Sequence, residues 1–295
     1  MHSKRLSYAL SGLMLGGMAV SPPAVAASAH EVAKQAEASM MVVGTLTVAP
    51  NGSVSSYQLD DAEKLPAAVS GLLQQAIPSW QFDPMVRDGK PVSVRSRMSL
   101  RVVLHPLGDK RYRLYLAGAY FSADGKPLKS DASRRTQPRY PMQAIRDKVS
   151  GTVYLALKVD AQGRVIDAMA EQVNLRIAGD DHEMERYRRL LADSALKAAH
   201  SWVLDPRWFD GAGDHYAMVP VSYALNVGPG GHAMPDSPGH WDVYVPGPRH
   251  SVPWFDAGTM VAGSGDALPD GGVYLFNAGG PHLKTKFSIP RKLPR

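Results

Sequence analysis

The sequence of 295 residues contains no cysteine. This absence excludes disulfide bonds, a cysteine nucleophile and lipid attachment through a cysteine side chain. The fold must therefore be stabilised by the burial of apolar side chains. Roughly 270 residues follow the N-terminal segment, which is enough for about two domains with hydrophobic cores of their own.

The sequence also lacks the short motifs of several enzyme classes. It has no Gly-x-Ser-x-Gly, no His-Glu-x-x-His, no Walker sequence and no dinucleotide-binding fingerprint. Serine, histidine and aspartate are present, but no local arrangement singles out a catalytic triad, whose members need not be neighbours in sequence. We therefore expect a protein that is not an enzyme and that carries no cofactor.

Clusters of basic residues and of metal ligands are sparse as well. The net charge is +6 with neutral histidines, and the basic residues are scattered rather than grouped, which disfavours nucleic acid as a partner. The histidines of the C-terminal quarter lack the short pairs typical of zinc sites. An Asp/His/Glu group at 179–183 is more typical of solvated charge than of a metal site. No metal is expected.

The N-terminus has the pattern of a cleaved secretory signal. Lys4 and Arg5 form a positive end, and the apolar stretch Leu6–Val20 is short for a membrane-spanning helix. Small residues at Ala24–Ala26 fit a cleavage site before Ala27. We expect residues 1–26 to be removed on export, which changes the net charge from +6 to 6 − 2 = +4. An uncleaved anchor is the alternative.

One stretch, residues 138–225, has an ordered series of secondary-structure signals. Tyr140-Pro141 precedes a short amphipathic helix, and strict alternation of apolar residues then predicts two strands joined by a turn that ends at Gly163. Apolar residues at helical spacing lead into Trp202, and a further strand follows Asp205-Pro206. The predicted elements are helix 142–149, strands 153–159 and 165–173, helix 190–202 and strand 218–225.

This order and spacing resemble the C-terminal domain of TonB, the energy-transducing protein of the Gram-negative cell envelope. The resemblance covers residues 138–225 and is specific in combination rather than in any single motif. The matching residues are Tyr140, Pro141, Ala144, Gly151, Val159, Asp160, Gly163, Val165, Ala195, Leu196, Ala198, Trp202, Pro206 and Val219–Tyr223.

The resemblance implies a periplasmic protein-binding module. In that family the last strand lies at a sheet edge and accepts an extended peptide of an outer-membrane TonB-dependent receptor by β-strand addition, during transmembrane transport. Pro220 also suits an edge strand, because proline has no N–H to donate. Another envelope protein is a further expected partner. The corresponding partner-binding residues here are Met218, Val219, Pro220, Val221, Ser222 and Tyr223.

A structural role is the alternative to peptide binding. The same edge is satisfied equally well if the C-terminal part of the chain, or a second copy in a homodimer, covers it. The protein would then be a scaffold or a dimerisation protein of the cell envelope.

The region from Ala29 to Leu104 is expected to be a second, degenerate copy of the same unit. With Gly52 placed on Gly163, the strand–turn–strand pattern coincides, and Ser79–Pro84 repeats the Ser-Trp-x-x-Asp-Pro pattern of Ser201–Pro206. The extra residues of the second copy lie around 179–183 and predict a loop or a helix extension. Trp80 and Trp202 each end an apolar helical face and are predicted to be core residues.

The predicted fold class is α+β. It consists of two TonB-C-terminal-like units, each a small antiparallel three-stranded sheet packed against one or two helices, and an irregular C-terminal extension. A strand at 112–121 either extends the first sheet or bridges the two sheets. The predicted division is a signal peptide at 1–26, a degenerate unit at 27–107, a strand and linker at 108–137, a second unit at 138–227 and a Gly/Pro-rich extension at 228–295.

Overall fold

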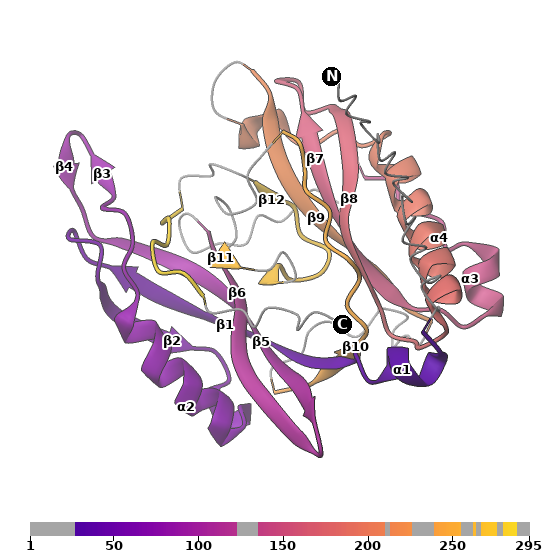
Figure 1. Ribbon diagram of the computed structural model, residues 1–295. Coiled ribbons are helices and arrows are strands. Elements are labelled where there is room, and N and C mark those ends of the chain that lie inside the picture. Colours follow the sequence, from indigo (N-terminus) through magenta and orange to yellow (C-terminus); the bar gives the residue numbers. More distant parts are fainter. Residues whose placement is uncertain are drawn as a thin grey trace, which may run out of the picture.

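The computed structural model describes residues 27–122, 135–209, 213–225, 239–254, 262–263, 267–275 and 280–287. The predicted signal segment lies outside these residues. The chain has a mixed α+β fold in which two large antiparallel sheets carry helices on their outer faces and C-terminal segments lie between the sheets (Figure 1). Strands β3 and β4 form a separate two-stranded hairpin. The predicted α+β class is thus confirmed at this level.

The first sheet has the strand order β10-β1-β5-β6-β11. On the same edge of β1, β10 pairs with its start, Glu37–Ser39, and β2 pairs with its end, Gly44–Val48. Helix α2 covers its outer face (Figure 1). Because β6 pairs with β5, the strand after the first predicted unit extends this sheet. The elements are α1 Ala29–Ala33, β1 Glu37–Val48, β2 Val54–Leu59, η1 Ala62–Lys64, α2 Ala67–Ala76, η2 Ile77–Ser79, β3 Val86–Arg87, β4 Lys90–Pro91, β5 Val94–Gly108, β6 Arg111–Ser122, β10 Asp242–Tyr244 and β11 Ala262–Gly263.

The second sheet has the strand order β12-β9-β7-β8, and α4 packs on β7 and β8. The predicted first helix is too long, and the predicted last strand begins three residues late and ends two residues late. Helix α3 ends at Arg146 because Lys148 adopts a left-handed conformation, with φ 54°, and β9 ends at Tyr223. The elements are α3 Met142–Arg146, β7 Gly151–Val159, β8 Val165–Leu175, α4 Asp181–Ala199, η5 Pro206–Trp208, β9 His215–Tyr223 and β12 Tyr274–Leu275.

The charged segment at 179–183 begins helix α4. Asp180 is the N-cap, its side chain accepts from the Glu183 N–H at 2.9 Å, and the Glu183 carboxylate accepts from the Asp180 N–H at 3.2 Å. This reciprocal capping box satisfies donors that have no partner within the helix. The helix-extension interpretation is therefore confirmed. Among the described residues, no three potential metal ligands form a group.

The two sheets contain the same hairpin-to-tryptophan connection. Gly52 and Gly163 occupy equivalent turns with φ values of 84° and 82°. The Phe82 N–H donates to Gly52 O at 2.8 Å, and the Leu204 N–H donates to Gly163 O at 2.7 Å. A Cβ at either glycine would lie 2.2 Å or less from the partner carbonyl oxygen, so the close approach requires glycine.

Both tryptophans are core residues, each only 2% exposed. Trp202 packs in the second core and its indole N–H donates to Thr136 O at 2.8 Å. Trp80 packs in the first core with its ring edge-on to Phe121, at a centroid distance of 5.6 Å. Each indole therefore joins a helix end to its own sheet, as the apolar periodicity predicts.

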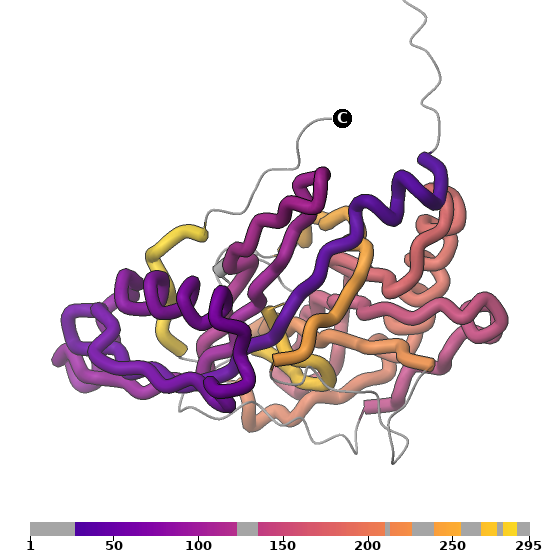
Figure 2. The backbone as a smooth tube through the Cα atoms, turned by 90° about the horizontal axis from the view of Figure 1, so that it is seen from below, coloured from indigo at the N-terminus to yellow at the C-terminus, as the bar shows by residue number. Residues whose placement is uncertain are grey.

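The start of the described chain contacts the second sheet rather than the first. Val32 of α1 belongs to the core that contains Trp202, and the Ala27 N–H donates to the Asp181 carboxylate at 2.7 Å. In Figure 2 the indigo N-terminal helix lies beside α4, and β1 then runs away from it into the first sheet. Within the described part of the chain, no helix is both long enough and apolar enough to span a bilayer.

Candidate functional site

The six predicted partner-binding residues all lie on β9. This strand pairs along its whole length with β7, from His215 opposite Val159 to Tyr223 opposite Gly151. On its other edge, the ladder pairing among described residues is with β12, at Ala217 and Met218 alone. Val221 and Ser222 are half-buried, and the other four predicted residues are buried. Whether the six bind a partner stays a prediction.

In the first sheet, the strand equivalent to β9 is paired along much more of its outer edge. β5 takes the place of β9 there, and its outer edge pairs with β6 in eleven residue pairs, from Arg97 with Ser122 to Gly108 with Arg111. A two-residue strand occupies the same position on the second sheet. Among the described residues, addition of a longer strand to β9 would displace β12 and the contact of Ser222 with Asp270, whereas β5 is already paired on both sides.

The segment 267–275, which contains β12, is held between the two sheets. Val273 and Leu275 are buried in the core that contains Trp202, and Tyr274 turns the other way and meets Tyr120 edge-on at 5.0 Å. The Ser99 hydroxyl of β5 donates to Ala267 O at 2.9 Å. The side chains of Val273, Tyr274 and Leu275 thus alternate between the two faces, as in an extended segment.

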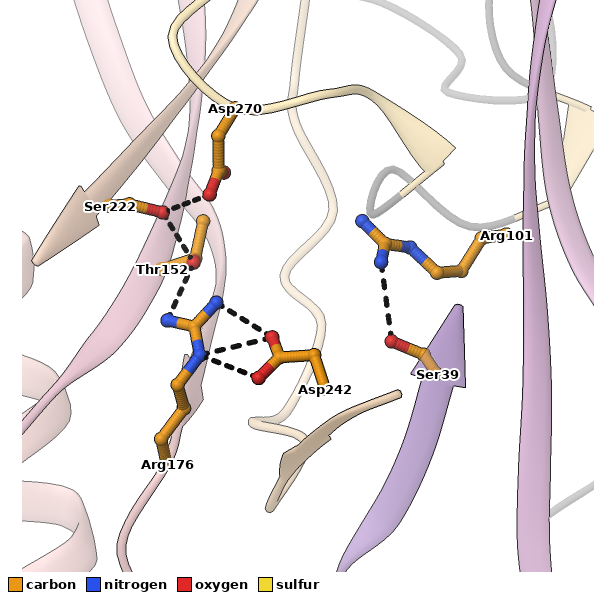
Figure 3. Close-up of polar contacts among 7 residues, drawn as sticks. All are labelled: Ser39, Arg101, Thr152, Arg176, Ser222, Asp242 and Asp270. Atoms are coloured by element: carbon orange, nitrogen blue, oxygen red, sulfur yellow. Dashed lines mark hydrogen bonds and ion pairs between the residues drawn. The ribbon is translucent and has the colours of Figure 1, made fainter. Parts of the chain in front are cut away.

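A polar cluster continues from this segment across the second sheet (Figure 3). The Ser222 hydroxyl donates to the Asp270 carboxylate and lies 2.9 Å from the Thr152 hydroxyl, to which Arg176 Nη1 donates at 3.3 Å. The Arg176 guanidinium in turn binds the Asp242 carboxylate, with Nη2 2.7 Å from Oδ2 and Nε 2.9 Å from Oδ1. The cluster thus links the segment before β12, strands β9 and β7 and the residue after β8 to β10 of the first sheet.

The Arg176–Asp242 pair is the electrostatic centre of this cluster. Burial acts to lower the pKa of the Arg176 guanidinium, but the hydrogen bonds and charge of Asp242 outweigh it, so this pKa is raised. A two-point arginine–carboxylate contact also fixes the relative orientation of the two segments that carry it. The pair therefore holds the end of β8 against β10.

The cavity beside the cluster is small. Its volume is about 10 Å³ and its walls include Arg101, Asn174 and Tyr244. That is room for about one water molecule, far below the ~300 Å³ at which small-molecule sites begin. Asn174 lines it, and its buried Nδ2 has no hydrogen-bond partner, which suits a bound water. The small volume of this cavity therefore fits a hydrogen-bonded link between the two sheets rather than a small-molecule site.

Asp242, Asp270 and Arg176 were not predicted from the sequence as site residues. They come from three segments that are far apart in the chain and carry no shared motif. The one available signal was the set of aromatic and apolar residues after position 240, which predicts that part of the C-terminal extension packs on the rest of the protein.

The chain was compared with protein families, curated proteins and solved structures. No family model, no curated protein and no solved structure matches it significantly.

Alkaline pH is expected to weaken the contact between the sheets at Tyr120. Burial raises the pKa of its hydroxyl to about 12, against about 10 in the unfolded chain. The associated stability is fully present below pH 10 and is lost as the pH rises through 12. In urea titrations, the wild type should lose about 1 kcal/mol more between pH 8 and pH 11 than Tyr120→Phe, which keeps the ring. Equal losses would contradict this assignment.

Proposed function

We propose that this protein is a non-enzymatic periplasmic protein-binding module whose two units resemble the TonB C-terminal domain. It binds an extended segment of an outer-membrane TonB-dependent receptor, or of another envelope protein, by strand addition at β9. The observation that carries the proposal is the two-residue β12 on an edge where the equivalent β5 has a full-length neighbour. The backbone groups of such an edge are the general means by which sheets bind peptides.

The way in which β12 binds indicates which peptides fit. Val273 and Leu275 enter the core on one face of the sheet, and Tyr274 packs on Tyr120 on the other face. A partner peptide should therefore be extended, with aliphatic residues two apart and an aromatic residue between them. Such a peptide competes with the protein's own segment for the same positions.

The test is a titration of the full chain with extended receptor peptides of this pattern, followed by amide chemical shifts. Shifts are expected at the amides of Met218–Tyr223 other than Pro220, which has no N–H. Leu275→Ala should tighten binding about 10-fold, because a smaller side chain weakens the competing segment and raises the binding-competent fraction. Leu283→Ala is the matched control, since Leu283 is also a buried C-terminal leucine but bridges to Phe82 of the first unit. Its affinity should equal that of the wild type.

Two outcomes would contradict strand addition at β9. One is a set of shifts that leaves Met218–Tyr223 unchanged. The other is an equal gain in affinity for Leu275→Ala and Leu283→Ala, which would indicate general loosening rather than competition at the edge. Far-ultraviolet circular dichroism confirms that both variants are folded before the comparison is made.

A structural scaffold or dimerisation protein is the second candidate. It is favoured by the burial of Val273, Tyr274 and Leu275 and by the polar cluster from Asp270 to Asp242. Both features indicate that a segment of the same chain covers the edge of β9. Light scattering combined with the peptide titration separates the two. A stable dimer that ignores peptides supports the scaffold, and a monomer that binds them supports the module.

A further inference from the structure

The β5–β6 hairpin extends beyond the sheet to which it belongs. β1 pairs with β5 only as far as Leu104, and β11 pairs with β6 only at Gly118 and Ala119. From His105 and Arg113 to the turn, the two strands pair with each other alone among the described residues. Figures 1 and 2 both show this ribbon projecting from the body of the protein. An isolated two-stranded ribbon has little stability of its own. The stability of the sheet therefore does not explain why this hairpin is so long.

The tip combines exposed apolar side chains with positive charge. All residues from Leu107 to Arg113 are exposed, and the Leu107 and Tyr112 side chains are among the most exposed large apolar groups, at 42% and 59%. The cations are Lys110, Arg111 and Arg113. One acid, Asp109, lies 3.7 Å from Arg111, so the net charge of the tip is 3 − 1 = +2.

The turn itself places a cation at the end of the ribbon. Gly108, Asp109 and Lys110 have φ values of 84°, 52° and 58°. Two successive left-handed residues form the turn that suits the twist of a hairpin. Aspartate tolerates this conformation, but at the second position glycine adopts it with less strain than lysine. The sequence thus keeps Lys110 at the tip at some cost in backbone energy, which is a feature more common at functional positions than elsewhere.

We infer that this hairpin tip docks on an anionic phospholipid surface. The cations match the negative headgroups, and Tyr112 and Leu107 match the boundary between headgroups and acyl chains, where tyrosine is enriched. A soluble polyanion would be bound by the cations alone and would gain nothing from the two apolar side chains. Membrane docking of this kind is reversible and weakens with salt, because it is largely electrostatic.

The β3–β4 hairpin supplies a matched control. It carries Arg87 and Lys90, and its Val86 side chain is 62% exposed. In both views it lies at a different extremity of the protein from the β5–β6 tip, so a flat membrane that touches one tip does not reach the other (Figures 1 and 2). Reversal of two charges at either hairpin changes the net charge of the protein by the same amount.

The experiment is cosedimentation of the full chain with vesicles of equal parts phosphatidylglycerol and phosphatidylcholine. All variants share the N-terminal segment, so its own affinity cancels in the comparison. Lys110→Glu with Arg113→Glu should lower the partition coefficient by about 30-fold or more, at about fivefold per cation. Arg87→Glu with Lys90→Glu should change it by less than about threefold. Tyr112→Ser, which keeps every charge, should lower it about fivefold.

Three results would overturn the inference. The first is an equal loss of binding for both charge-reversal pairs, which would indicate attraction to the net charge alone. The second is an unchanged partition coefficient for Tyr112→Ser, together with equally tight binding of that variant to heparin, which would assign the tip to soluble polyanions. The third is the absence of any difference between these vesicles and vesicles of phosphatidylcholine alone.

Discussion

Trp202→Ala is expected to lower the free energy of unfolding by about 3–5 kcal/mol. The indole is 2% exposed, packs with Leu191 and Ala195 of α4 in the second core and donates its N–H to Thr136 O. Its removal creates a cavity at the end of the helix and leaves that carbonyl without its partner. Urea denaturation measures the loss, which corresponds to a melting temperature lower by roughly 10 °C.

Trp202→Phe separates the two contributions of the indole. Phenylalanine keeps a ring in the core but cannot donate to Thr136, so a smaller loss, about 1–2 kcal/mol, is expected. Trp80→Ala should resemble Trp202→Ala, because Trp80 is equally buried and packs against Phe121. A melting temperature of Trp202→Ala within a couple of degrees of the wild type would show that the indole does not stabilise the second core.

Gly163→Ala is expected to cost about 2–5 kcal/mol. The left-handed backbone, with φ 82°, accounts for about 1–2 kcal/mol of this loss. The remainder arises because the new Cβ would lie 2.0 Å from Leu204 O, so the hairpin turn and the segment that follows Trp202 must move apart. That movement stretches the hydrogen bond from the Leu204 N–H to Gly163 O.

Gly108→Ala is the matched control for this prediction. Gly108 has φ 84°, almost the same as Gly163, but no atom lies within 4 Å of the position of its Cβ. It should therefore show the backbone cost alone, about 1–2 kcal/mol. If the two substitutions cost the same in urea denaturation, the close approach to Leu204 contributes nothing. Gly52→Ala, with Phe82 O at 2.2 Å, should behave like Gly163→Ala.

Local patterns predicted most of the secondary structure. The alternation of apolar residues located β7 and β8, and the helical spacing of apolar residues located α2 and α4. These patterns work because one face of each element must leave water, and that requirement repeats at the period of the element. The ends were predicted less well, as at α3, because a single left-handed residue such as Lys148 decides where a helix stops.

Such local patterns could not predict the polar cluster. Asp242, Asp270 and Arg176 are brought together by packing between sheets, and nothing in their immediate neighbours distinguishes them from solvated charges. The same is true of the contact of Val32 with the second core, since α1 precedes a strand of the first sheet. Contacts of this kind depend on the arrangement of whole elements rather than on sequence spacing.

The sequence by itself determined where the longer helices and strands form, the two glycine turns and the burial of both tryptophans. Each of these follows from backbone conformation and apolar periodicity within a few dozen residues. Only the tertiary structure decided that β6 completes the edge of β5 while two residues of β12 cover the edge of β9. The reason is that strand pairing uses backbone groups, which are the same in every residue, so the sequence of an edge does not specify its neighbour.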